Sequence, residues 1–91
     1  MKENIEFETV TIIDPATNRK QDAVSVIRNG YQVALLPEAD RLRRAMALSL
    51  EEVKQIIDEF PVIMNREPTR DENEFWKAII DYKRSQDQVY Q

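Results

Sequence analysis

Cysteine and histidine are both absent from this chain, and each absence removes classes of chemistry. Without cysteine there are no disulfides, no thiolate metal ligands and no thiol nucleophiles. Without histidine the chain lacks the usual general base near neutral pH and the most common zinc ligand. The serines Ser25, Ser49 and Ser85 therefore have no imidazole to activate them. We predict that the protein is not an enzyme and that it uses no cofactor or metal.

Glycine and long apolar runs are also scarce. Gly30 is the only glycine, which excludes a glycine-rich phosphate loop. Nowhere do about eighteen apolar residues follow one another, the length a membrane-spanning helix needs. The opening residues, MKENIEFETV, lack the apolar segment of a signal peptide. We therefore expect a cytoplasmic protein that does not enter a membrane.

The length of 91 residues, 42% of them hydrophobic, suits one small domain with a modest core. A homodimer would bury more area and stays open as an alternative. The patterns below predict an α+β domain in which a three-stranded antiparallel sheet is followed by two or three helices. Within residues 1–91 the expected divisions are strands in 1–37, two helices in 38–60, a linker at 61–70, a C-terminal helix at 71–84 and a frayed tail at 85–91.

The clearest local signal is the dipeptide Asn29-Gly30 between two apolar runs. This dipeptide favours a type I′ turn, which needs positive φ at both positions and joins the two strands of a hairpin. A two-residue turn fixes the register of the strands. The predicted pairs are Arg28 with Tyr31, Ile27 with Gln32, Val26 with Val33 and Val24 with Leu35.

The segment Ile5–Ile13 is rich in β-branched residues and predicts another strand. Its alternation slips midway, because Ile5 and Phe7 share one face whereas Val10 and Ile12 share the other. Either a bulge near Glu8–Thr9 or burial on both faces would explain the slip.

Three helices are predicted after the hairpin. The first begins at Pro37 and runs to Leu48, with its arginines toward water. A capping box at Ser49 and Glu52 starts the second, which we expect to end at Phe60 because Pro61 disfavours helix at the residue before it. A second capping box, formed by Thr69 and Glu72, starts the third.

The net charge of −4 argues against a purely electrostatic nucleic-acid binder, but the charge is unevenly distributed. Residues 19–44 hold six basic residues against three acidic ones. The residues in this basic middle that could contact phosphates are Arg28, Arg41, Arg43 and Arg44. The alternative is an ordinary solvated helix face.

Large apolar side chains nearly encircle the last predicted helix. Aromatic residues on such a helix are typical anchors for a partner protein. The alternative is that the helix completes the core of its own domain. The candidate partner-binding residues are Phe75, Trp76, Ile79, Ile80 and Tyr82.

The run Val24–Asp40 (VSVIRNGYQVALLPEAD) resembles the hairpin of the Phd/YefM family of type II antitoxins. Similar strings occur in AbrB/VapB-type antitoxins and in the wing of MerR-type regulators. The resemblance implies an N-terminal part that dimerises and binds duplex DNA, and a C-terminal segment that neutralises a toxin.

Two functions are consistent with these observations. The first is an antitoxin-like regulator that binds DNA through its basic middle and a partner protein through its C-terminal helix. The alternative is a phage-type small inhibitor or adaptor that binds a larger host protein and does not contact nucleic acid.

Overall fold

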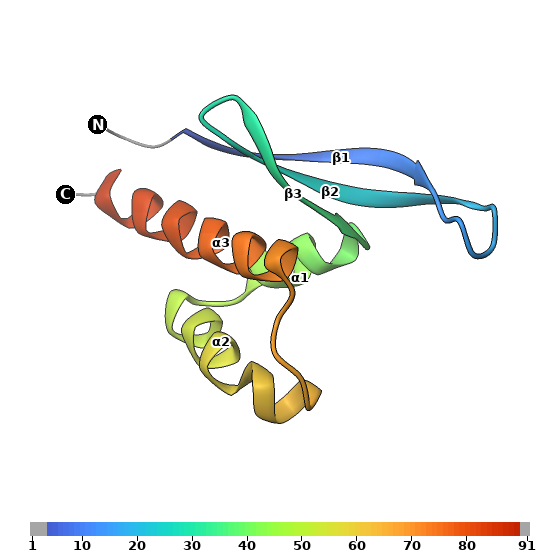
Figure 1. Cartoon of the computed structure of the whole chain (residues 1–91). Coiled ribbons are helices and arrows are strands. Elements are labelled where there is room, and N and C mark those ends of the chain that lie inside the picture. Colours follow the sequence, from blue (N-terminus) through green and yellow to red (C-terminus); the bar gives the residue numbers. More distant parts are fainter. Residues whose placement is uncertain (1–3, 90–91) are drawn as a thin grey trace.

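The computed structural model describes residues 4–89, and it confirms an α+β fold with a three-stranded antiparallel sheet followed by three helices (Figure 1). The sheet has the strand order β1-β2-β3. The elements in chain order are β1 (Ile5–Ile13), β2 (Lys20–Arg28), β3 (Tyr31–Pro37), α1 (Asp40–Ala47), α2 (Leu50–Met64) and α3 (Arg70–Val89). Among these described helices, none is both long enough and apolar enough to cross a bilayer.

The helices cover one face of the sheet and leave the other face open (Figure 1). α3 lies along the covered face and packs most extensively on β3. α2 lies on the side of α3 that faces away from the sheet (Figure 1). The molecule therefore has three layers, with α3 between the sheet and α2.

The hairpin turn is confirmed at Asn29-Gly30, where φ is 53° and 86°. These are the positive angles that a type I′ turn requires. The pairs nearest the turn, Arg28 with Tyr31 and Ile27 with Gln32, also match the prediction.

Beyond these two pairs the predicted register is wrong. A bulge in β3 adds one residue, Val33, so that Val26 pairs with Ala34 and Val24 with Leu36 instead of Val33 and Leu35. The extra residue turns Ala34 and Leu36 toward the core, where both are buried. Since Ala34 is small, it leaves room for the backbone of α3 to approach β3.

β1 shows the opposite outcome. It pairs with β2 along its whole length without a register shift, so the bulge considered at Glu8–Thr9 is absent. Ile5 and Phe7 pack with the core beneath the helices, and Val10 and Ile12 lie half-buried on the other face. Partial burial on both faces of β1 therefore explains the slip in alternation.

Three helix boundaries differ from the prediction. α1 begins at Asp40 and not at Pro37, because Pro37 is the last residue of β3 and pairs with Ala23. α2 continues through Pro61 to Met64 and ends at Asn65, whose φ of 55° is left-handed. We attribute this continuation to Phe60, which is buried and holds the chain against α3 across the proline. α3 reaches Val89, so residues 85–89 are helical and not frayed, and the expectation for residues 90 and 91 lies outside the described residues.

Candidate protein-interaction surface

The face of α3 toward the sheet forms the centre of the hydrophobic core. Phe75, Ala78 and Ile79 are fully buried there. The ring of Phe7 from β1 packs edge-on against Phe75 at 6.5 Å and against Tyr82 at 5.8 Å between centroids. Because Phe75 and Ile79 have no exposed surface, they cannot contact a partner of the folded domain. This corrects the expectation that all five large residues of the helix bind a partner.

Of the other three members, Tyr82 is the one that packs on Phe7. Trp76 and Ile80 lie on the flank of α3 that turns toward α2, where the Trp76 ring also meets Phe75 edge-on at 5.1 Å between centroids. They line a groove of about 490 Å³ between α2 and α3, which we call the α2–α3 groove. Both are only partly buried. The indole Nε1 of Trp76 has no hydrogen-bond partner among the described residues. The complete lining is Ile57, Phe60, Pro68, Asn73, Trp76, Lys77, Ile80, Asp81 and Arg84.

Next to this groove, the last turn of α2 exposes three consecutive apolar residues, Val62, Ile63 and Met64, which we call the α2 tip. Val62 is 83% exposed and Ile63 is 64% exposed. A smaller hollow of about 190 Å³ includes Ile63 and Met64 and shares Phe60 and Trp76 with the groove. The apolar surface of the tip therefore adjoins that of the groove.

Sequence reasoning missed the α2 tip because it ended the helix at Phe60 and treated the next residues as a connection. A signal was present in the sequence. Three successive apolar residues in a helix point about 100° apart, so they cannot all face one core. Once the helix is known to continue past Pro61, exposure of part of this segment follows.

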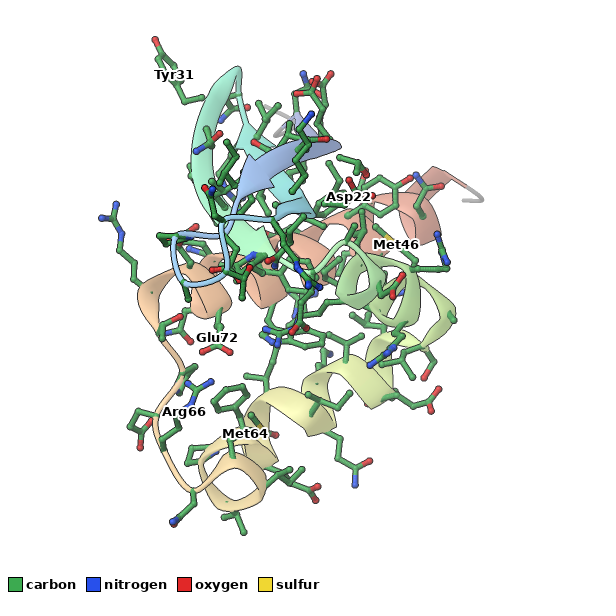
Figure 2. All side chains as sticks on the ribbon, turned by 90° about the vertical axis from the view of Figure 1, so that its right-hand side faces the viewer. Asp22, Tyr31, Met46, Met64, Arg66 and Glu72 are labelled. Atoms are coloured by element: carbon green, nitrogen blue, oxygen red, sulfur yellow. The ribbon has the colours of Figure 1, made fainter. Side chains whose placement is uncertain are left out.

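A buried carboxylate, Glu72, joins the linker and α1 to the first turn of α3. It accepts hydrogen bonds from the Arg66 guanidinium at 2.7 and 3.1 Å and from Arg41 at 3.3 Å. Figure 2 shows the Arg66 and Glu72 side chains pointing toward each other. The second predicted capping box is confirmed, because the Thr69 N–H donates to Glu72 and the Thr69 hydroxyl accepts from the Glu72 N–H.

The same contacts determine the charge state of Glu72. The hydrogen bond from Arg66, helped by those from Thr69, lowers the pKa of Glu72 from 4.5 to about 2, although burial opposes the shift. Arg66 also lies over the ring of Phe60, 5.2 Å from its centroid. This ion cluster therefore fastens both ends of the 65–69 linker and holds the end of α2 beside α3.

The four arginines proposed for phosphate contact do not form one exposed patch. Arg28 pairs with Asp81 of α3 at 3.1 Å, and its side chain is only 13% exposed. Arg41 pairs with Glu72 at 3.3 Å and is partly buried, contrary to the expectation that it faces water. Arg43 and Arg44 are exposed on α1.

The described residues contain no group of three or more acidic side chains arranged to hold a metal ion. Of the serines in this part of the chain, Ser25 donates to Gln32 across the hairpin. Ser49 caps α2, where the predicted box with Glu52 is confirmed. Both hydroxyls therefore have structural partners.

Comparisons with protein-family models, curated proteins and solved structures return no match to this chain. The resemblance of Val24–Asp40 to the Phd/YefM hairpin stays a prediction.

Proposed function

We propose that this protein is a non-enzymatic protein-interaction module that binds a partner through the α2–α3 groove and the α2 tip. The observation that carries the proposal is the exposed apolar α2 tip, of which Ile63 and Met64 line a hollow that adjoins the groove. Single exposed hydrophobic residues are ordinary, whereas contiguous apolar patches on small proteins mark interaction sites.

The position of α2 supports the same proposal. It packs on α3 and covers only part of the Trp76 and Ile80 side chains. A partner that covered the groove and the tip would bury Trp76, Ile80, Ile63 and Val62 together. Buried aromatic anchors surrounded by apolar contacts are where protein–protein binding energy concentrates.

Of the two functions expected from the sequence, the inhibitor or adaptor without nucleic-acid contact has the better support. DNA contact through the basic middle would draw on Arg28 and Arg41, which already pair with Asp81 and Glu72. The exposed pair Arg43 and Arg44 is left, which is a small footprint for an acidic protein on DNA.

Site-specific photocrosslinking tests the proposal. A photoreactive phenylalanine analogue at Ile63 is compared with the same analogue at Ile13, since the two residues are 64% and 62% exposed and Ile13 lies on β1. We expect a discrete cross-linked protein from position 63 in the native cell, and none from position 13. Equal products from both positions, or none from position 63, would contradict the proposal.

A gel shift distinguishes the two functions. If the antitoxin-like regulator is correct, duplex DNA from the protein's own locus binds at low salt, and the affinity falls steeply as salt rises. The charge-removing pair Arg43→Ala and Arg44→Ala would then weaken that binding. We expect no gel shift with the natural chain or with this variant. A salt-dependent shift would instead support the antitoxin-like regulator.

A further inference from the structure

Two positively charged side chains lie along one side of the α2–α3 groove. Lys77 and Arg84 of α3 line it, and both are exposed. They are seven positions apart in the sequence, so they lie on one face of the helix and about 10 Å apart along its axis. No salt bridge to either is present among the described residues, although the chain carries a net charge of −4.

The rest of the groove does not neutralise these cations. Asp81, the one carboxylate in the lining, pairs with Arg28 from β2. The wall opposite α3 consists of Ile57 and Phe60 from α2 and Pro68 from the linker, none of which carries a charge. The groove therefore has an apolar interior and positive charge along one side only.

The shape of the groove suits a helix. Its α3 wall is the stripe formed by residues 73, 76, 77, 80, 81 and 84, which recur at helical spacing. A stripe from residue 73 to residue 84 is about 16 Å long, or three helical turns. A groove between two helices accepts the apolar face of a third, whose contacts fall at i, i+3 or i+4, and i+7.

We propose that the groove binds an amphipathic helix of the partner protein, with an apolar stripe flanked on one side by two carboxylates about seven residues apart. The apolar stripe would cover Trp76 and Ile80, and the carboxylates would pair with Lys77 and Arg84. This inference rests on the proposed function and specifies the chemistry of the partner segment.

Two synthetic helical peptides of equal length test the proposal. Both carry leucines at i, i+4 and i+7. On one side of this stripe, one peptide has two glutamates seven positions apart, and the other peptide has lysines at the same two positions. Binding is followed through the emission of Trp76, the only tryptophan, and through the anisotropy of a label on the peptide. We expect the glutamate peptide to bind about tenfold more tightly at low salt, with the preference shrinking at high salt.

Charge reversal in the groove supplies the decisive comparison. The double variant Lys77→Glu and Arg84→Glu should invert the peptide preference. The matched control, Arg43→Glu with Arg44→Glu on α1, changes the net charge equally and should leave the preference as it is. Thermal melts of both variants show whether the fold is retained. If the groove variant does not fold, the double variant Lys77→Gln and Arg84→Gln, which removes the two positive charges without reversing them, is used in its place and should abolish the preference.

Three outcomes would overturn the inference. One is equal binding of the two peptides, and another is the absence of any binding that perturbs Trp76. The third is self-association that the groove variant abolishes, because the occupant would then be a second copy of this chain. Crosslinking from Ile63 to another protein, found together with equal peptide binding, would leave the proposed function standing and reject only the acidic helix.

Discussion

The two sides of α3 carry similar residues but have different surroundings. Toward the sheet, Phe75 and Ile79 are fully buried, and Phe75 meets the ring of Phe7. Away from the sheet, Trp76 and Ile80 are only partly covered, because a single helix packs there and leaves a groove beside it. One side is a finished core, and the other side leaves apolar surface exposed.

This difference shows how a small domain accommodates a helix that is apolar nearly all round. Three strands of the sheet pack on one side of α3. On the other side only α2 packs, and the 65–69 linker and the ion cluster at Glu72 hold it there. The side with fewer internal contacts is the one that we propose binds a partner. Four variants test this view, and they are ordered by their expected effect on stability.

Phe75→Ala should have the largest effect, because it empties a fully buried aromatic site on the sheet side. We expect a loss of about 3–5 kcal/mol in the free energy of unfolding. Urea denaturation followed by circular dichroism measures it. Tyr31→Ala is the control, since Tyr31 is 77% exposed and projects from the hairpin tip (Figure 2). A loss no larger than that of the control would contradict the assignment of Phe75 to the core.

Trp76→Ala removes a side chain of similar size from the groove side. Because Trp76 is partly exposed, we expect only about 1–2 kcal/mol of lost stability, below the range for a fully buried aromatic. Binding of the partner should weaken by about 2 kcal/mol or more, as it does when an aromatic anchor is truncated. Denaturation and a binding titration of the same variant separate the two effects. A stability loss equal to that of Phe75→Ala, with binding unchanged, would show that Trp76 is structural.

Lowering the pH should loosen the groove side before the sheet side. The pKa of Glu72 is about 2 in the folded protein and 4.5 ordinarily, so the carboxylate stabilises the fold fully above pH 4.5. This stabilisation is lost as the pH falls from 4.5 toward 2. Allowing for solvent around Arg66, we expect it to amount to about 1–2 kcal/mol.

The variant Glu72→Gln isolates this contribution. Its stability should lie below that of the natural chain at pH 7, and the gap should close between pH 4.5 and pH 2. Glu67→Gln, which changes an exposed carboxyl in the 65–69 linker, is the control. A constant gap at every pH would mean that the ion pairs of Glu72 contribute nothing to folding.

The smallest change in stability is expected at the α2 tip. Val62→Lys with Ile63→Lys replaces two exposed side chains, so the free energy of unfolding should change by less than about 0.5 kcal/mol per site. Crosslinking from a photoreactive group at Met64 should nevertheless disappear, because the tip would no longer be apolar. Retained crosslinking would exclude the tip from the interface.

Local signals in the sequence predicted much of this fold. Asn29-Gly30 located the turn, and the capping boxes at Ser49 and Thr69 located the starts of α2 and α3. Each of these signals acts within a few residues, so the neighbouring sequence alone determines the turn or the helix start. The order of elements follows from them.

The features that escaped prediction depend on contacts distant in the sequence. Whether Val33 bulges depends on how closely α3 approaches β3, and continuation past Pro61 accompanies the burial of Phe60 beside α3. The candidate site was half predicted. Trp76 and Ile80 line the groove, whereas Phe75 and Ile79 belong to the core, and helical periodicity alone could not tell which side of α3 meets the sheet.

The bulge at Val33 also has a consequence for how this hairpin tolerates insertions and deletions. An extra residue in one strand shifts the alternation of its side chains between the two faces of the sheet. Two residues an even number of positions apart, one on each side of the bulge, therefore point to opposite faces. The turn at one end and the core at the other can therefore each keep their own alternation. Deleting Val33 would bring the strand into a single phase and pair Val26 and Val24 as before with Ala34 and Leu36. The turn pairs, Arg28 with Tyr31 and Ile27 with Gln32, would then directly follow the core pairs. The deletion would therefore be absorbed at the bulge itself, and neither the turn nor the core would have to shift.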